Sequence, residues 1–303
     1  MSILKEYFTL DDIKKLNREF YLPYAALGAR TCYANNLKIE DLLSDKRVQG
    51  EKIQEFLLKL SKVRHFSVFS HTFTWIRFDT KEDARYVSSM LFKSIYGETC
   101  TAYWHGDEDE KSYYVGISLR HILETWNTEE EQREIINTFG EYKKYIEPLQ
   151  LSDKTYVVYT DTRFGGWLVV FFQDISRVTT HQFVRHTKLN FSQRSDRYTN
   201  NIENSIVIPP STQEDEVSSR LVINHDKLTR SIYASLLERG IKKEDARYIL
   251  GEGNKSSLLV SGSFTDWYNF ISLRTDKHAQ WEIRSLATDV QDFLTDVITT
   301  IKW

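Results

Sequence analysis

The chain has 303 residues, 41% of them hydrophobic and 27% charged, so it can bury the core of one large domain or two modest ones. Its 40 lysines and arginines nearly balance 43 aspartates and glutamates, which leaves a net charge of -3. This balance excludes the strong basic field that recruits a nucleic-acid polymer or an anionic membrane. The N-terminus lacks a secretory pattern, no stretch approaches about 18 apolar residues, and only Cys32 and Cys100 are present. We therefore expect a cytoplasmic protein with reduced thiols.

The first half of the chain predicts two helices followed by strands. Helices are expected over residues 10–20 and around 53–60, where apolar residues recur at helical spacing. Three runs rich in β-branched and aromatic residues follow, at 72–78, 156–159 and 167–172. We expect these runs to be strands of an antiparallel or mixed sheet.

The second half predicts more helix. Apolar residues keep near-heptad spacing over 221–236, and Gly240 marks the end of that helix. The clearest helix covers 286–301 and has one continuous apolar face. Since four prolines and 12 glycines leave little material for a linker, the sequence predicts a single domain over residues 1–303.

The segment 182–198 is unusually dense in groups that can form oriented hydrogen bonds. It holds three arginines, a lysine and a histidine, interleaved with apolar and aromatic residues. Arg185 and Arg197 can make forked contacts to phosphate oxygens, while Gln193 and Ser195 suit the polar edge of a pyrimidine or sugar. The composition alone fits a binding site for a phosphorylated aromatic ligand and a salt-bridged helix end equally well.

The segment 274–284 places His278 and Glu282 four residues apart, like half of a metal site. No second histidine completes the pattern, so we expect a hydrogen-bonded helix pair and no metal. The chain also lacks the glycine-rich phosphate loop, the dinucleotide fingerprint and the nucleophile elbow. Neither cysteine has an activating neighbour, which argues against a thiolate nucleophile.

Together these two segments resemble the flavin-dependent thymidylate synthase family. The family signature is Arg-His-Arg, seven residues and then Ser, and here Arg185-His186-Thr187 is followed after seven residues by Ser195. The run from Leu273 to Ile283 is similar to the second family signature nearly letter for letter. The resemblance covers about residues 20–78 and 165–300, in order.

The resemblance implies an α/β (α+β) chain with a central antiparallel sheet wrapped by helices, assembled as a homotetramer. It also implies a methyltransferase that converts dUMP to dTMP. The one-carbon donor would be methylenetetrahydrofolate, and FAD reduced by NADPH would supply the hydride. Roles carried over by position give Arg274 as the catalytic residue, facing the pyrimidine, where a fixed guanidinium can stabilise developing negative charge. The nucleotide would be bound by Gln182, Arg185, Gln193, Ser195, Arg197 and Arg274, and FAD by His71, Arg185, His186, Thr187, Asn269 and His278.

Several positions depart from the family pattern. Thr187 replaces the second arginine of the signature, and Ser257 stands where the family has a phosphate-contacting arginine, a role for which Lys255 is a substitute. Other departures are Ser70, Ser263 and Thr265. Residues 79–165 form an insertion that either covers the site, extends an interface or adds a helical layer. These changes leave two alternatives open: one-carbon transfer to a different pyrimidine nucleotide, and a non-catalytic nucleotide-binding relative.

Overall fold

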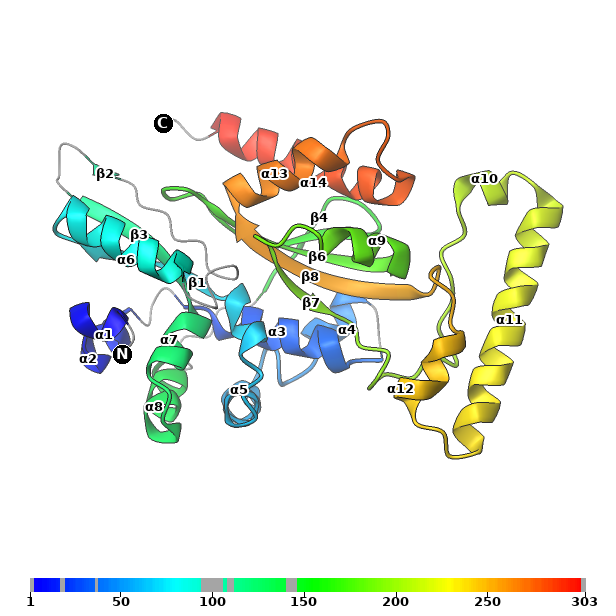
Figure 1. Ribbon diagram of the computed structural model, residues 1–303, viewed down its shortest axis with the longest axis horizontal. Helices are drawn as coiled ribbons and strands as arrows, with labels where there is room; N and C mark the ends of the chain where they lie inside the picture. The colour runs from blue at the N-terminus through cyan, green and yellow to red at the C-terminus, as the bar shows by residue number, and fades with distance from the viewer. Residues whose placement is uncertain are drawn as a thin grey trace.

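The computed structural model describes residues 3–16, 20–35, 38–93, 106–107, 112–139 and 146–300 (Figure 1). Cys100 lies outside these residues, whereas Cys32 is a free thiol. Among the described residues, no helix is long and apolar enough to cross a membrane.

A five-stranded sheet forms the centre of the molecule, and every neighbouring pair in it is antiparallel, which is one of the two arrangements that the strand pattern left open and the one that the resemblance implies. Its order is β4 (Leu149–Gln150), β5 (Thr155–Asp161), β6 (Trp167–Ser176), β8 (Lys255–Ser263) and β7 (Asn190–Gln193). Alternate side chains of a strand point to opposite faces, and both faces of β6 are buried. This explains why the run 167–172 is continuously apolar instead of alternating.

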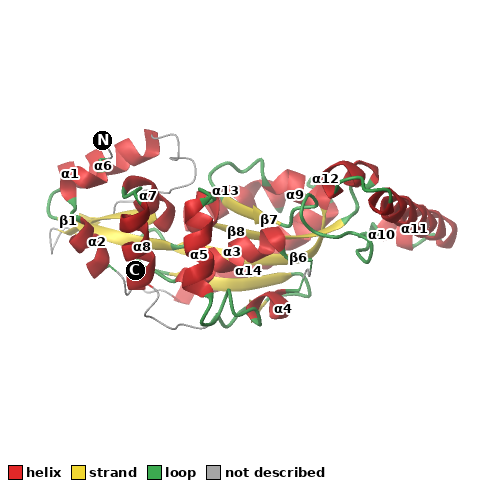
Figure 2. Cartoon of the chain, turned by 90° about the horizontal axis from the view of Figure 1, so that it is seen from below, coloured by secondary structure: helices red, strands yellow, loops and turns green. Residues whose placement is uncertain are grey.

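Helices cover both faces of this sheet (Figures 1 and 2). On one face lie α9 (Arg177–Phe183), α13 (Phe264–Arg274) and α14 (Trp281–Thr300), which share a buried core with Leu168, Val170 and Phe172. On the other face lie α3 (Leu22–Tyr33) and α4 (Ile39–Leu43), packed with Val169 and Phe171. The predicted class, a central sheet wrapped by helices, is confirmed.

The N-terminal helices and the described part of the insertion share a core of their own. Its small antiparallel sheet has the order β1 (Phe73–Phe78), β3 (Ser112–Ser118) and β2 (Gly106–Asp107). The helical elements around it are α1 (Leu4–Tyr7), α2 (Leu10–Lys15), α5 (Ile53–Lys62), η1 (Phe66–His71), α6 (Lys81–Lys93), α7 (Leu119–Thr125) and α8 (Glu129–Phe139). The insertion thus extends this core and also supplies β4 and β5 to the central sheet.

At the opposite end of the molecule, α11 (Glu216–Glu238) stands beside the body as an arm (Figure 1). The short elements α10 (Pro210–Gln213), α12 (Lys243–Ala246) and η3 (Arg247–Ile249) connect it to the body. Asp215 caps its first turn by accepting from the backbone of Val217 and Ser218. Gly240, with φ +82°, follows its end as predicted.

Most expected elements are confirmed, and one is too long. The helix predicted over 10–20 is α2, which ends at Lys15. Thr9 caps its first turn in a reciprocal hydrogen-bonded pair with Asp12. Phe20, at the expected helix end, instead lies outside a helix and buries its ring in the N-terminal core.

Candidate functional site

Arg274, the last residue of α13, is held by two groups from α9 and the turn that follows it. Its Nε donates to Nε2 of His186 at 2.9 Å. Its Nη1 and Nη2 donate to Gln182, to the side-chain Oε1 at 3.3 Å and to the backbone oxygen at 3.2 Å. Because three donors are engaged, the guanidinium has a fixed orientation. The structure therefore brings together three residues that the sequence predicted.

His186 acts as an acceptor, so in this arrangement its proton sits on Nδ1. Burial, and second the charge of Arg274, lowers the pKa of His186 to about 4. Its ring forms a T-shaped contact with Phe270 at 5.0 Å between centroids, and Phe270 stacks on Phe183 at 4.8 Å. Packing and charge thus keep a neutral imidazole in place to orient the arginine.

Arg185 and Thr187 are both exposed beside this pair. Burial, and then the charge of Arg185, lowers the pKa of Arg274. Among the described residues, neither arginine forms an ion pair with a carboxylate. Two arginines whose charges repel and are not neutralised make a local positive site that suits an anion such as a phosphate.

A second group of predicted residues lies at the end of β7 and just after it. Gln193 donates from Nε2 to Oγ1 of Thr180 on α9 at 2.9 Å. The backbone N–H of Ser195 donates to the carbonyl of Cys32 at 3.0 Å. Arg197 is exposed and pairs with Glu244 at 3.2 Å. This group is joined to the Arg274 cluster through α9, which carries both Thr180 and Gln182.

His71 is the predicted cofactor residue that lies deepest. It is 0% exposed, and its ring nitrogens bond to the hydroxyls of Ser261 and Ser192, each at 2.9 Å. Burial lowers the pKa of His71 to about 3, so the ring is neutral. In this chain the two hydrogen bonds of His71 therefore join η1 to β7 and β8 in the interior. Its ring has no accessible surface that a ligand could contact.

Asn269 and His278 are exposed on α13 and on the loop after it. The predicted hydrogen-bonded pair of His278 and Glu282 is wrong, because α14 begins only at Trp281. His278 instead bonds through Nδ1 to Asp276 at 2.8 Å. Glu282 is 1% exposed. Its carboxylate accepts hydrogen bonds from the hydroxyl of Thr179 and from Nζ of Lys154, each at 2.7 Å. Glu282 thus fastens α14 to α9.

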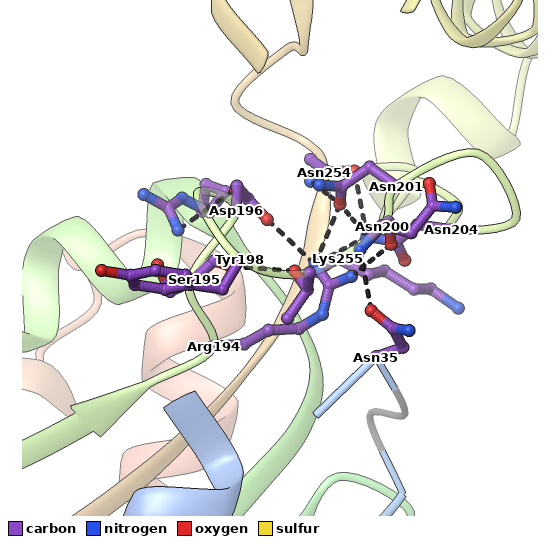
Figure 3. A network of polar contacts seen from close by, with 12 residues as sticks. Asn35, Arg194, Ser195, Asp196, Tyr198, Asn200, Asn201, Asn204, Asn254 and Lys255 are labelled. Atoms are coloured by element: carbon purple, nitrogen blue, oxygen red, sulfur yellow. Dashed lines mark hydrogen bonds and ion pairs between the residues drawn. The ribbon is translucent and has the colours of Figure 1, made fainter. Parts of the chain in front are cut away.

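A buried polar network fixes the chain after β7 (Figure 3). Arg194 is 1% exposed and donates from Nη1 to Asp196 and to Asn201, each at 2.9 Å. Asn254 donates to the same oxygen of Asn201 at 3.1 Å. Arg230 of α11 donates to the backbone oxygen of Asn201 at 2.7 Å. The network therefore ties the segment of Ser195 and Arg197 to β8 and to the arm.

Three contributors to this region were not predicted from the sequence: Phe270, Thr180 and Asp196. Phe270 precedes Arg274 by four residues, so helical spacing on one face could have pointed to it. Thr180 gives no such signal, since its contact with Gln193 crosses from a helix to a strand. Asp196 stands between two arginines in sequence, but only the fold shows that it pairs with Arg194 and Arg177.

The larger cavities of the described residues lie elsewhere. One of about 990 Å³ and one of about 620 Å³ share Lys38, Asp174 and Lys255 in their walls. Lys255, the expected substitute for a phosphate-binding arginine, thus lies in these cavities and not beside Arg274. Arg274, His186 and Gln182 line neither of these two cavities.

Comparisons with known proteins identify relatives over the part of the chain that carries this cluster. Residues 168–298 match the family described as thymidylate synthase complementing protein. The flavin-dependent thymidylate synthase of Saccharolobus solfataricus is 40% identical over 117 residues, which cover 38% of this chain and 44% of that protein. The one from Pyrococcus furiosus is 35% identical over 135 residues, 42% of this chain and 55% of that protein.

Over this region the chain is similar to the flavin-dependent thymidylate synthases. The predicted resemblance is confirmed over a region that contains α9, β7, β8, α13 and most of α14. The enzyme from Mycobacterium leprae matches a longer stretch, 24% identical over 217 residues, 65% of this chain and 81% of that enzyme. At higher identity, the chain spans about half the length of the curated flavin-dependent thymidylate synthases that it matches. Its own activity, substrates and assembly are therefore inferred below.

Proposed function

We propose that this protein is a FAD-dependent methyltransferase that converts dUMP to dTMP, with methylenetetrahydrofolate as the one-carbon donor and NADPH as the reductant. The observation that carries the proposal is the guanidinium of Arg274, fixed by His186 and Gln182 beside the unpaired charge of Arg185. The names of the similar proteins support the flavin and the thymidylate product. The roles of donor and reductant rest on the family resemblance.

The residues present fit a flavin nucleotide in part. Arg185 is exposed and forms no ion pair among the described residues, so it offers a cation for a phosphate. His186 follows it directly and contacts Arg274 of α13, while Asn269 and His278 are exposed polar groups on α13 and on the loop after it. His71 does not fit a direct contact, because its ring is enclosed by two hydroxyls. Bound FAD would supply the hydride chemistry. His71 would act indirectly, because its hydrogen bond to Ser192 holds β7 in place.

In this proposal the chain itself binds and polarises the nucleotide. Gln182, Gln193, Ser195 and Arg197 hold dUMP, and Arg274 faces a carbonyl oxygen of the pyrimidine. Because His186 is neutral, it leaves the full charge of Arg274 available to stabilise negative charge on that oxygen. No covalent nucleophile from the protein is required. We further propose that the enzyme is cytoplasmic and homotetrameric, as the resemblance implies.

The test follows the flavin spectrum of the purified protein loaded with FAD. NADPH added without oxygen should bleach the flavin, and dUMP with methylenetetrahydrofolate should restore its colour and give dTMP, detected by mass. Arg274→Ala should keep the fold but slow the dUMP-dependent step by about 10²-fold or more. Arg133→Ala, an exposed arginine of α8, is the matched control and should leave the rate unchanged. Unchanged turnover in Arg274→Ala would contradict the role of this arginine.

A different pyrimidine nucleotide is a second candidate substrate, supported by position 257. Ser257, where the family pattern has a phosphate-contacting arginine, is 0% exposed, and its hydroxyl has no hydrogen-bond partner among the described residues. The neighbouring Arg194 already pairs with Asp196. Competition between dUMP and other pyrimidine nucleotides for the FAD-loaded protein separates the two candidates, since the true substrate binds more tightly. Failure to retain FAD at all would instead favour the non-catalytic relative.

A further inference from the structure

Helix α9 carries groups that hold Arg274, but it is too short to keep its place alone. It has seven residues, with Gln182 in its last turn and His186 shortly after its end. Isolated helices of this length are not stable in water. The position of α9 therefore depends on its tertiary contacts, including those of its first turn, far from Arg274.

Glu282 holds this first turn. Its carboxylate accepts hydrogen bonds from the backbone N–H of Ser176 at 3.2 Å, from the hydroxyl of Thr179 at 2.7 Å and from the hydroxyl of Ser176. Ser176 is the N-cap of α9, so the negative charge lies at the positive end of the helix dipole. Since Glu282 is 1% exposed, water does not compete for these bonds.

Lys154 supplies a cation to this buried carboxylate. Its Nζ lies 2.7 Å from Oε1 of Glu282 and 5.8 Å from the ring centroid of Trp281. The ammonium offsets the desolvation penalty that a buried carboxylate carries. Lys154 belongs to the insertion over residues 79–165, whereas Glu282 and α9 lie within the residues 168–298 that match the family. The insertion thus contributes a charge that acts on the matched region.

We propose that Lys154 and Glu282 are positioning residues for Arg274. By holding the first turn of α9, they set the places of Gln182 and His186, which orient the guanidinium. Arg274 ends α13 and Glu282 lies in the first turn of α14, so two neighbouring helices bind α9 at its two ends (Figure 1). The bonds from Arg274 to Gln182 are 3.3 and 3.2 Å long, so a shift of α9 by about 0.5 Å would break them.

The first test measures the mobility of the guanidinium by nuclear magnetic resonance, with neither nucleotide nor flavin present. The Nε–H of Arg274, assigned by its loss in Arg274→Ala, should exchange slowly with water, because it is bonded to His186. Lys154→Met should raise this exchange rate about tenfold or more, because the bond opens more often. Lys154→Arg retains the cation and should keep the slow rate.

Two further variants separate positioning from folding. Lys154→Met combined with Glu282→Gln leaves no unpaired charge in the interior, so the protein should fold. It should show the same faster exchange, since an amide has one acceptor oxygen where the carboxylate has two. Lys38→Met is the matched control, because Lys38 pairs with Asp174 at 2.6 Å beside α4, on the other face of the central sheet. Slow exchange at Arg274 in the double variant, with an unchanged circular dichroism spectrum, would overturn the proposal.

The second test concerns catalysis, and this part of the inference rests on the proposed function. In the FAD-loaded protein the double variant should lower kcat for dUMP-dependent reoxidation of the flavin about tenfold or more, with little change in the KM for dUMP. Lys154→Arg should retain most of the rate, and Lys38→Met should retain all of it.

The two tests fail separately. An unmodified protein that makes no dTMP would contradict the proposed function, and the exchange rate at Arg274 would still decide whether Lys154 and Glu282 position the guanidinium. Faster exchange in the double variant with an unchanged kcat would overturn the catalytic part of the inference alone.

Discussion

Gly28 of α3 lies directly against the ring of His71, the last residue of η1. A methyl group at position 28 would lie 2.6 Å from Cδ2 of His71 and 3.1 Å from the hydroxyl of Ser192. The histidine cannot move aside freely, because both of its ring nitrogens are bonded. Glycine therefore lets helix α3 approach the ring closely.

We expect Gly28→Ala to destabilise the protein by about 1–3 kcal/mol, although alanine favours a helix, because the methyl group must displace a bonded ring. Urea unfolding followed by circular dichroism measures the change. Gly251→Ala is the matched control, since no atom lies within 4 Å of a methyl group there. Equal stabilities of the two variants would show that the ring of His71 can move aside without lowering the free energy of unfolding.

At the scale of elements, the segment after β7 is positioned by ion pairs inside the protein. Arg194 and Asp196 pair at 2.9 Å with side chains 1% and 7% exposed, and Arg177 lies 3.4 Å from the same carboxylate. Burial of the pair makes it sensitive to loss of one partner, since the remaining charge keeps its desolvation penalty. The position of the backbone that carries Ser195 and Arg197 therefore depends on these buried ion pairs.

Arg194→Met should lower the free energy of unfolding by about 3–5 kcal/mol, because Asp196 would lose its main buried partner. Adding Asp196→Asn should recover part of this loss, because the unpaired carboxylate is then removed. Thermal and urea unfolding of the single and double variants give the comparison, with Arg133→Met as an exposed arginine control. A double variant less stable than the single one would mean that Asp196 is held mainly by Arg177.

The sequence was most informative where one element carries the whole pattern. Helices α11 and α14 and the strand at 167–172 follow from residue type and spacing, whereas the site roles of Arg274 and His186 came from the family resemblance. The interior position of His71 could not be predicted, because its two hydroxyl partners come from strands far away in the chain. The same holds for Glu282, whose partners lie on α9 and at Lys154 and not on its own helix.

On the scale of the whole molecule, the N-terminal core and the core on the α3 face of the central sheet meet near η1. The cluster around Arg274 is carried by α9 and α13, which cover the opposite face of that sheet (Figure 1). Two buried histidines, His71 and His121, make the stability of this fold depend on pH. Burial lowers the pKa of His71 and of His121 to about 3 each, from 6.5. Both rings are thus neutral when the protein is folded and can take a proton when it unfolds.

We expect the protein to lose stability as the pH falls below about 6.5. A histidine whose pKa is lowered in the folded state contributes its full stability only above the pKa that it has in the unfolded state. This contribution is lost as the pH falls from that value toward and through the pKa of the folded state. Each of the two buried rings should contribute a slope of about 1.4 kcal/mol per pH unit between these limits. Urea unfolding at pH 7.5, 6 and 5 measures the slope.

His121→Phe provides the control, because both ring nitrogens of His121 are buried and have no hydrogen-bond partner in the part of the chain that the structure describes. Phenylalanine fills a similar volume with no group to protonate, so this variant should match the unmodified protein at pH 7.5 and lose less stability at pH 5. His71→Phe should already be less stable at pH 7.5, since it leaves the hydroxyls of Ser192 and Ser261 unpaired. An unmodified protein equally stable at pH 7.5 and pH 5 would mean that neither histidine changes its pKa on folding.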